Sequence, residues 1–295
     1  MYMDKIKSGE QQSSVQESKS HIIMKSENEN KEVKAISSKQ RPSFEIGLLG
    51  GYEYAFGNGC NDDVKSLAQV WKNLFAADAS YKSMNNGYGG GIECKWHNSS
   101  AIFFGNDHVS IGVRAGYWKF NIAEANAALH SEYSYMVQDL SMRKYYETSF
   151  IPFLIGCKYY LCALKYLFIY SGIYTGVGHT EVVEGNTTKI RFYSRDTSYL
   201  YEDDLRASAI YSGYGFTYDA IIGTDYQITR YLWVGLEIYY RYFNVPVRSS
   251  GNYKMDIYYG DNIVHKGDYL INRDKKRILI DLNGLISQFK ISYCF

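Results

Sequence analysis

Residues 43–56 read SFEIGLLGGYEYAF, a stretch in which apolar residues alternate with charged or small ones. Successive side chains of a β-strand point to opposite faces, so this alternation predicts a strand with two unlike faces. The apolar face would carry Phe44, Ile46, Leu48, Tyr52, Tyr54 and Phe56. The other face would carry Glu45, Gly47, Gly51 and Glu53. Such a strand separates an apolar environment from a polar one.

The same period-two pattern recurs in seven further segments, up to the last residue. They lie near residues 88–96, 109–120, 149–161, 166–178, 216–226, 232–241 and 285–295. In all but one of them, charged, polar or glycine residues share one face and apolar residues occupy the other. The segment 166–178, YLFIYSGIYTGVG, is apolar on both faces, so its pattern assigns no inward side. Each segment has about the 9–11 residues that a tilted strand needs to cross the hydrocarbon layer of a membrane.

The connections between these segments alternate in length. The long ones are 57–87, 121–142, 180–214 and 243–277, and the shorter ones are 97–108, 161–165 and 227–230. An even number of antiparallel strands with long loops at one rim is typical of outer-membrane barrels. An open edge in lipid would leave backbone groups unpaired, so the sheet must close. We therefore predict an all-β fold, an eight-stranded antiparallel transmembrane β-barrel with long extracellular loops and short periplasmic turns.

Three other folds fit the pattern less well. A soluble calycin-type barrel also alternates, but it places apolar residues inside and polar residues outside. A soluble β-sandwich predicts less asymmetric loops. A membrane helix over residues 149–174 would contain Pro152, Lys158 and Lys165. A charge at the bilayer centre costs about 2.5–3.5 kcal/mol on insertion scales, which disfavours that helix.

Composition and charge limit the partners and divide the chain. The 295 residues include 32 Lys and Arg against 31 Asp and Glu, a net charge of +1. Binding of nucleic acid needs a basic surplus, so no nucleic-acid partner is expected. Residues 1–42 are rich in Lys, Glu, Ser, Gln and Asn, and we predict a disordered polar segment there. Within it no apolar core of an export signal is visible. The barrel domain is expected to cover residues 43–295.

The last seven residues, 289–295, read FKISYCF. Here the chain resembles bacterial outer-membrane β-barrel proteins, in which a terminal Phe after alternating apolar residues marks the closing strand for the barrel-assembly machinery. The stretches IPFLIGCKYYL and YLFIYSGIYTGVG are similar to the fourth and fifth strands of small eight-stranded barrels of the outer membrane protein A and W type. The resemblance covers residues 43–295, although Cys294 departs from the usual polar residues near the end.

The resemblance implies a location in the outer membrane of a Gram-negative bacterium and contact with outer-membrane lipid. It also implies that the closing strand carries a C-terminal assembly signal read by the barrel-assembly machinery. The residues of that signal would be Phe289, Ile291, Tyr293 and Phe295.

The inward positions of the predicted barrel carry charges of both signs. The carboxylates are Glu45, Glu53, Glu93, Asp219, Asp225 and Glu237, and the cations are Lys95, Arg114, Lys158, Arg241 and Lys290. An eight-stranded barrel is only wide enough for side chains to fill, and buried charges must pair. We therefore predict a lumen charge network that plugs the barrel. The alternative is a narrow porin-like conduit for ions or small solutes, in which Arg114 or Arg241 exchanges carboxylate partners.

Motifs for catalysis or metal binding are weak. None of the six His residues has a second ligand at metal spacing, and the sequence has no nucleophile elbow or phosphate-binding glycine loop. We expect no metal, no cofactor and no catalytic residue. The five Cys residues are odd in number and indicate no disulfide framework, and Cys157 should face lipid. A loop-based outer-membrane enzyme remains the second alternative. Its candidate groups are His179 with Glu181 and Glu184, and Ser194 with Asp196.

Two of the long connections are suited to contact with a partner. Residues 57–87 contain DDVKSLAQVWKNLFAADAS, which predicts a short amphipathic helix capped by Asp62 or Asp63. Residues 180–214 contain Tyr193, Tyr199, Tyr201 and Tyr211, and Tyr provides large contact area at low entropy cost. We expect a non-enzymatic structural or surface-interaction protein, with loops 57–87 and 180–214 as sites for an unidentified surface ligand.

Overall fold

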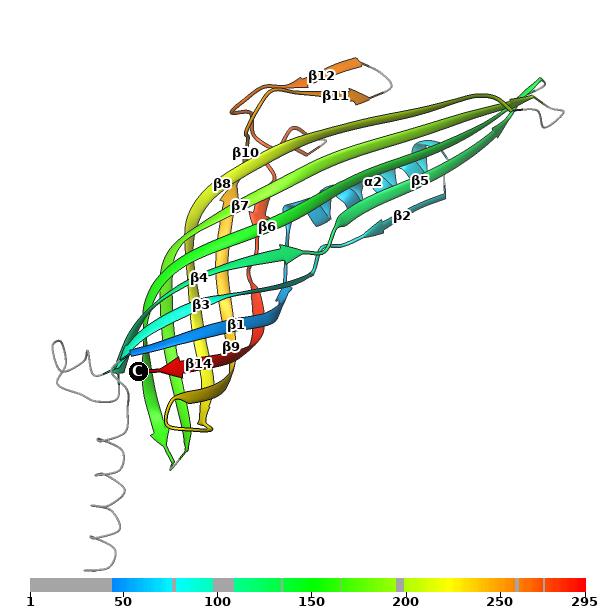
Figure 1. Cartoon of the computed structure of the whole chain (residues 1–295). Coiled ribbons are helices and arrows are strands. Elements are labelled where there is room, and N and C mark those ends of the chain that lie inside the picture. Colours follow the sequence, from blue (N-terminus) through cyan, green and yellow to red (C-terminus); the bar gives the residue numbers. More distant parts are fainter. Residues whose placement is uncertain are drawn as a thin grey trace, which may run out of the picture.

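Eight antiparallel strands form a hydrogen-bonded ring that closes on itself (Figure 1). The structure is a computed structural model, and it describes residues 44–75, 78–97, 109–133, 135–164, 166–194, 199–257, 260–272 and 274–295. In ring order the strands are β1 (Phe44–Ala55), β3 (Asn86–His97), β4 (Val109–Phe120), β6 (Met136–Ala163), β7 (Leu167–Ser194), β8 (Tyr199–Gln227), β9 (Leu232–Pro246) and β14 (Gly284–Cys294). The predicted eight-stranded antiparallel barrel is confirmed.

Pairing between the first and last strands closes the ring. Glu45 of β1 lies opposite Cys294 of β14, and Tyr54 lies opposite Leu285. The opposite edge of β1 pairs with β3 from Phe44 to Tyr54. Each strand of the ring therefore has two hydrogen-bonded neighbours, so the ring has no open edge of the kind that lipid does not tolerate.

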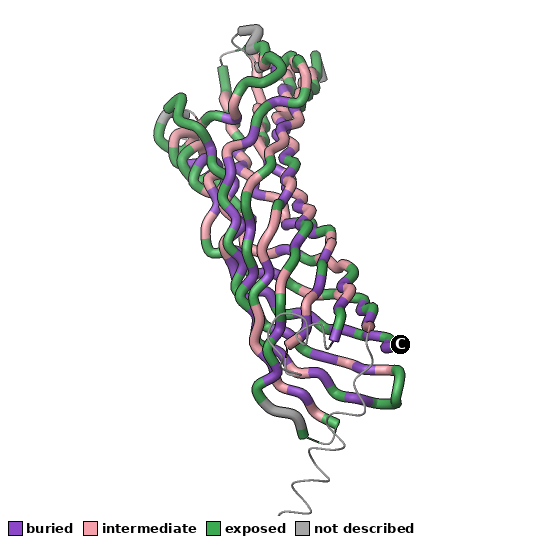
Figure 2. Tube along the Cα trace, turned by 90° about the vertical axis from the view of Figure 1, so that its left-hand side faces the viewer, coloured by how far each residue is buried: buried purple, intermediate pink, exposed green. Residues whose placement is uncertain are grey.

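The outer surface of the ring is apolar, and the inner surface is polar. Along β14 buried and exposed residues alternate at every position, and along β9 every second residue is buried. Figure 2 shows buried and exposed residues alternating along the strands. The exposed positions include Leu48, Ile222 and Ile238, each more than 60% exposed. Their buried neighbours in sequence include Glu237. The predicted faces are confirmed, and segment 166–178 now has an inward side that carries Phe168, Tyr170 and Tyr174. Cys157 is exposed, as expected.

Aromatic residues flank the aliphatic zone of this outer surface at both ends. Toward one rim Tyr52 pairs with Tyr88, and both are exposed. Toward the other rim Tyr231 stacks on Tyr293 at 5.9 Å between ring centroids. We call this second rim the turn rim, because the short connections from β6 to β7 and from β8 to β9 lie there, and we call the first one the loop rim. Two aromatic girdles around an apolar band are the pattern of a membrane barrel.

Three strands continue beyond the ring at the loop rim (Figure 1). Strands β6, β7 and β8 are 28, 28 and 29 residues long, far more than the roughly 9–11 residues needed to cross a membrane. Strand β5 (Ala123–Glu132) pairs with β6, and β2 (Asp78–Lys82) pairs with β5. The prediction of long loops over 121–142 and 180–214 is therefore wrong. Most of these residues extend the sheet, because pairing between strands satisfies backbone hydrogen bonds outside the membrane as well as inside it.

Helix α2 (Gly59–Phe75) lies beside this extension, as predicted for the first long connection. Its predicted cap is wrong. The helix begins before Asp62 and Asp63, and Asn58 is the N-cap because its side-chain oxygen accepts a 2.9 Å hydrogen bond from the Cys60 amide. Cys60, Val64 and Ala68 form the buried face at a spacing of four residues.

The connection from β9 to β14 also contains structure. It includes β10 (Arg248–Ser249), which pairs with β8, and β13 (Leu279–Asp281), which pairs with β9. Between them β11 (Tyr253–Ile257) and β12 (Gly260–Val264) form a separate hairpin. Among the described residues, no helix is both long and apolar enough to cross a membrane. The prediction of disorder over 1–42, and most of connection 97–108, lie outside the described residues.

Gly156 tests the packing of the ring wall. A Cβ atom at Gly156 would lie 2.1 Å from the carbonyl oxygen of Ile173 and 2.6 Å from Cγ of Tyr174, whereas one at Gly50 would meet nothing within 4 Å. We expect Gly156→Ala to lower the free energy of unfolding by about 1–3 kcal/mol through overpacking. Gly50→Ala is the matched control and should change it by less than about 0.5 kcal/mol. Urea unfolding in lipid vesicles measures both, and equal stability of the two variants would contradict the packing described.

Candidate functional site

All eleven charged residues predicted for the lumen lie inside the ring and are buried. Seven strands contribute them: β1, β3, β4, β6, β8, β9 and β14. Strand β7 contributes no charge, but it places Tyr170 and Tyr174 among them. The charges come together because each occupies an inward-facing position of its strand. They form three groups along the barrel.

The central group is a ring of four alternating charges. The Arg114 guanidinium lies 2.7 Å from Glu93 and 2.5 Å from Glu237. The Lys158 ammonium lies 3.0 Å from Glu93 and 2.5 Å from Glu237. Each cation thus bridges the same two carboxylates, and each carboxylate meets both cations. No member of this group is left with an isolated charge.

Neutral donors complete the central group. The Tyr170 hydroxyl donates to Glu237 at 2.7 Å, and the Tyr174 hydroxyl donates to Glu93 at 2.9 Å. The Gln288 amide donates to Glu237 at 2.5 Å. A buried carboxylate has several lone pairs to satisfy, and these extra donors reduce the cost of removing it from water.

A second group lies toward the turn rim. Lys95 pairs with Glu45 at 2.9 Å, and Lys290 pairs with Asp225 at 2.5 Å. Cross contacts of 3.3 Å from Lys290 to Glu45 and 3.4 Å from Lys95 to Asp225 close this group into another alternating ring. His97 reaches Glu45 at 2.9 Å through Nε2. The charges again alternate in sign around the group.

The third group lies toward the loop rim and is built on one arginine. Arg241 donates to Asp219 and to Glu53, both at 3.0 Å. Its guanidinium also lies 4.9 Å from the ring centroid of Phe150 and 5.3 Å from that of Trp118. The group therefore joins the charges of the lumen to an aromatic layer above them.

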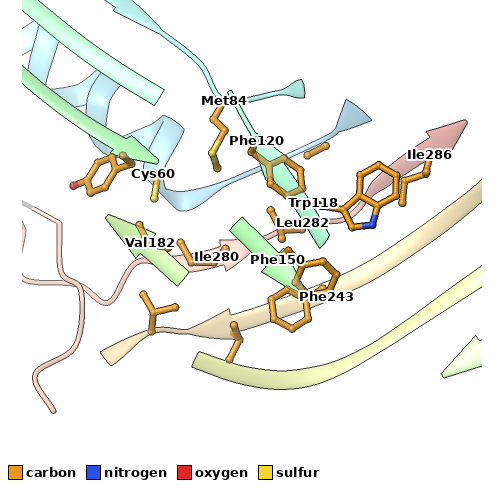
Figure 3. Packing of buried hydrophobic residues seen from close by; sticks show 14 of the residues in the cluster. Cys60, Met84, Trp118, Phe120, Phe150, Val182, Phe243, Ile280, Leu282 and Ile286 are labelled. Carbon is orange, nitrogen blue, oxygen red and sulfur yellow. The ribbon is translucent and has the colours of Figure 1, made fainter. Parts of the chain in front are cut away.

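That aromatic layer belongs to a hydrophobic cluster at the loop rim (Figure 3). Phe150 packs on Phe243 with 4.6 Å between ring centroids, and Phe120, Leu282 and Met84 lie in the same cluster. Beneath it, a cavity of about 20 Å³ is lined by Arg114 and Arg241 among others. This volume is enough for about one water molecule. The interior of the ring is thus filled by side chains.

The four residues of the predicted C-terminal assembly signal point outward. Phe289, Ile291, Tyr293 and Phe295 are all exposed at the end of the chain. Strand β14 is hydrogen-bonded on both sides, to β1 and to β9. Their role in assembly stays a prediction.

A much larger cavity lies outside the ring, where α2, the extended sheet and the β11–β12 hairpin meet. Its volume is about 790 Å³. We call it the rim cavity. Its apolar walls include Leu67 and Trp71 of α2 and Ile263 and Val264 of β12, with Met142 on the sheet. Neither the helix nor the hairpin alone could form it.

The floor of the rim cavity holds a buried charge cluster. The Lys144 ammonium of β6 lies 3.0 Å from Asp63 of α2 and 3.0 Å from Glu184 of β7. The Tyr146 hydroxyl donates to Asp63 at 2.7 Å, and the Tyr211 hydroxyl donates to Glu184 at 3.0 Å. We call these five residues the floor cluster. It ties the helix to three strands of the sheet.

The protonation states in the floor cluster follow from its surroundings. Burial alone would lower the pKa of Lys144, but Glu184 and Asp63 outweigh it and raise that pKa above its ordinary value. Burial and the adjacent carboxylates raise the pKa of both the Tyr146 and the Tyr211 hydroxyls. Lys144 therefore stays charged near neutral pH, and both tyrosines stay protonated and donate.

The structure places most of the other groups named from the sequence. His179 packs against Tyr214 at 4.5 Å between ring centroids. Glu181, two residues after His179 on β7, is exposed, whereas Glu184 is buried in the floor cluster. Ser194 ends β7, and Asp196 lies outside the described residues. In the part of the chain that is described, no three His, Cys, Asp or Glu side chains are placed to hold a metal ion.

The prediction of a tyrosine-rich loop over residues 180–214 is wrong, because its tyrosines lie on strands. Tyr193 lies on β7, and Tyr199, Tyr201 and Tyr211 lie on β8. Tyr201 is exposed, but Tyr211 is buried against Glu184. These residues form part of a sheet that frames a cavity.

The sequence reasoning missed the floor cluster. The sequence predicts Asp63 as a possible helix cap and Glu184 as a candidate catalytic group of a loop-based enzyme, and it makes no prediction for Lys144 and Tyr146. One signal was available: in the run Lys144-Tyr145-Tyr146, the charged residue and the second tyrosine share a strand face. The partners of that face, however, are far away in the sequence.

The chain is similar in structure to small outer-membrane β-barrels over most of its length, as the sequence resemblance implied. Ail, the attachment invasion locus protein of Yersinia pestis, matches with a TM-score of 0.29 and 10% identity, covering 86% of this chain and 99% of Ail. The outer membrane protein OprG of Pseudomonas aeruginosa matches with a TM-score of 0.33 and 9% identity, covering 86% and 97%.

Neisserial surface protein A matches with a TM-score of 0.26 and 8% identity, covering 85% of this chain and 96% of that one. Ail has also been crystallised with the heparin analogue sucrose octasulfate. No family model matches the sequence, and no curated protein is significantly similar to it.

The central group gives a direct test of charge pairing. Arg114→Ala leaves Glu93 and Glu237 with one cation between them, and breaking a buried pair in this way typically costs about 3–5 kcal/mol. The control is Arg206→Ala, which removes an exposed partner of Asp204 and should cost less than about 1 kcal/mol. Urea titration of the protein in lipid vesicles gives both values. A loss for Arg114→Ala no greater than for the control would show that the central group does not stabilise the ring.

Proposed function

We propose that this protein is an integral barrel of a bacterial outer membrane with a plugged lumen, and that it binds a ligand at the cell surface. The observation that supports this best is the contrast between the two ends of the molecule. Inside the apolar band the ring is filled by paired charges, and beyond the band the strands frame a cavity of about 790 Å³.

The outer surface of the ring supports insertion into lipid. Large aliphatic side chains such as Ile222 and Leu236 are mostly exposed on all sides of the ring. Soluble monomers rarely expose a contiguous apolar patch of more than a few hundred Å². Contact with lipid hydrocarbon removes the free-energy cost of exposing such an apolar surface to water. The aromatic girdles match the two interfaces of a bilayer.

The filled lumen argues against a conduit. A path through the ring would require at least one pair, such as Arg114 with Glu237, to separate in a buried setting. Leaving a buried charge without its partner costs about 3–5 kcal/mol. A state with that cost is populated roughly a hundredfold less than the closed state, or lower still. An open channel of large, steady conductance is not compatible with this arrangement.

The extension supports a binding role outside the membrane. Strands β6, β7 and β8 run well past the girdle, and α2 and the β11–β12 hairpin pack there. A barrel that served only as a membrane anchor would need none of these elements. Loops 57–87 and 180–214, which we expected to contact a ligand, both contribute residues to the rim cavity. The outward face of β14 would contact the assembly machinery before insertion.

Insertion in lipid predicts that the loss in the free energy of unfolding caused by a charged substitution on the outer surface depends strongly on its depth in the membrane. Ile222→Arg places a charge near the middle of the apolar band and should lower the free energy of unfolding by roughly 2–4 kcal/mol. Ile228→Arg is the matched control in a turn at the rim and should cost about 0–1 kcal/mol. Unfolding in lipid vesicles measures both. Equal and small losses would indicate that water, not lipid, surrounds the ring.

The plugged lumen predicts electrical silence. In planar bilayers the folded protein should show no large, steady channel, since each lumen charge has a buried partner. The same preparation should migrate faster on a cold gel than after heating, which verifies that a closed barrel was inserted. Steady channels from the heat-modifiable form would overturn the plug and favour the conduit.

A further inference from the structure

The rim cavity has the size and lining of a small-molecule site. Sites for drug-sized ligands occupy about 300–1,000 Å³, with mostly apolar walls and a few polar groups that fix orientation. The rim cavity, at about 790 Å³, has apolar walls from Leu67, Trp71 and Ile263. Polar residues also line it, and the buried charged ones among them, Asp63, Lys144 and Glu184, form the floor. The charge of that floor therefore decides which ligands fit.

The floor cluster has one more negative charge than positive charges. Two carboxylates, Asp63 and Glu184, share the single ammonium of Lys144, and Tyr146 and Tyr211 are neutral donors. Both carboxylate residues are more than nine-tenths buried. At such a site a charge interacts several times more strongly than it does in water. A ligand with a positive group would offset the surplus, and an anion would be repelled.

Three further basic residues line the cavity, but each is paired, stacked on a ring or exposed to water, and none belongs to the buried floor. Arg143 is paired with Glu124 at 2.6 Å, and the Arg277 guanidinium is stacked over Tyr269 at 3.9 Å from the ring centroid. Lys275 is exposed to water. Exposed charges are screened by salt beyond about 8–10 Å, whereas the buried floor is screened much less. The floor therefore controls the sign of the ligand.

We propose that the rim cavity binds a drug-sized apolar organic cation, with its positive group against Asp63 and Glu184 and its apolar body between α2 and the β11–β12 hairpin. The inference rests on the proposed function, because the cavity is reached from water only if the extension lies outside the membrane. It adds the chemical class of the ligand.

Two probe ions of nearly identical size and shape but opposite charge test the sign directly: tetraphenylphosphonium, a cation, and tetraphenylborate, an anion. The full chain is placed in lipid nanodiscs, and each ion is measured by equilibrium dialysis, with empty nanodiscs subtracting partition into lipid. We expect saturable binding of the cation at least about tenfold tighter than that of the anion, because Coulomb attraction to one surplus charge at a buried site provides that difference.

Variants locate the binding. Glu184→Gln removes the surplus charge and keeps an acceptor for Tyr211, and it should weaken cation binding at least about tenfold without weakening that of the anion. Asp63→Asn is a second variant with the same expected effect. Ile263→Trp narrows the cavity and should reduce cation binding with the floor intact. Glu202→Gln removes a carboxylate from the exposed end of β8, outside the lining of the rim cavity, and should leave binding unchanged.

Equal affinity for the two ions, tighter binding of the anion, or cation binding that Glu184→Gln, Asp63→Asn and Ile263→Trp all leave unchanged would each overturn the inference. Failure here is separable from failure of the proposed function. If the protein is silent in planar bilayers but does not prefer the cation, only the ligand class is wrong. If it conducts steadily, the plugged barrel is wrong whatever the probes do.

Discussion

Pairing of charges inside a closed ring is the constraint on which the rest of the structure depends. Arg114 and Lys158 each bridge Glu93 and Glu237, so four ions from four strands hold the interior in place. This arrangement works only if the ring closes, because closure removes the interior from water. Closure in turn leaves the opposite face of every strand to the surroundings. The apolar exterior and the ionic interior are thus two consequences of one geometry.

The sequence predicted the ring well because lipid and lumen impose opposite demands on alternate residues. All eight ring strands, and the faces of seven of them, followed from period-two patterns such as that of residues 232–241. Segment 166–178 was ambiguous for a physical reason. Its inward residues Tyr170 and Tyr174 count as apolar in a pattern, yet their hydroxyls are the donors that Glu237 and Glu93 require.

Outside the apolar band, period-two alternation no longer identifies the strands. Residues 136–142, 180–194 and 199–214 are strands with water on much of their surface, so no sharp alternation marks them, and we predicted loops. The floor cluster was hidden for another reason. Asp63, Lys144, Glu184 and Tyr211 are far apart in the sequence and meet only because three long strands pair with one another and α2 lies beside β6. Strand pairing and helix docking together create that site, and neither is encoded locally.

The orientation of the two faces is tested most directly by tryptophan fluorescence in lipids brominated at mid-chain. Two single-tryptophan variants, with the other tryptophans replaced by Phe, are compared: one keeps Trp118, which is buried in the ring, and one carries Ile238→Trp on the outer face. The account predicts strong quenching by bromine for the residue at 238 and little for Trp118. Equal quenching, or quenching of Trp118 alone, would contradict a ring that faces lipid with its apolar side.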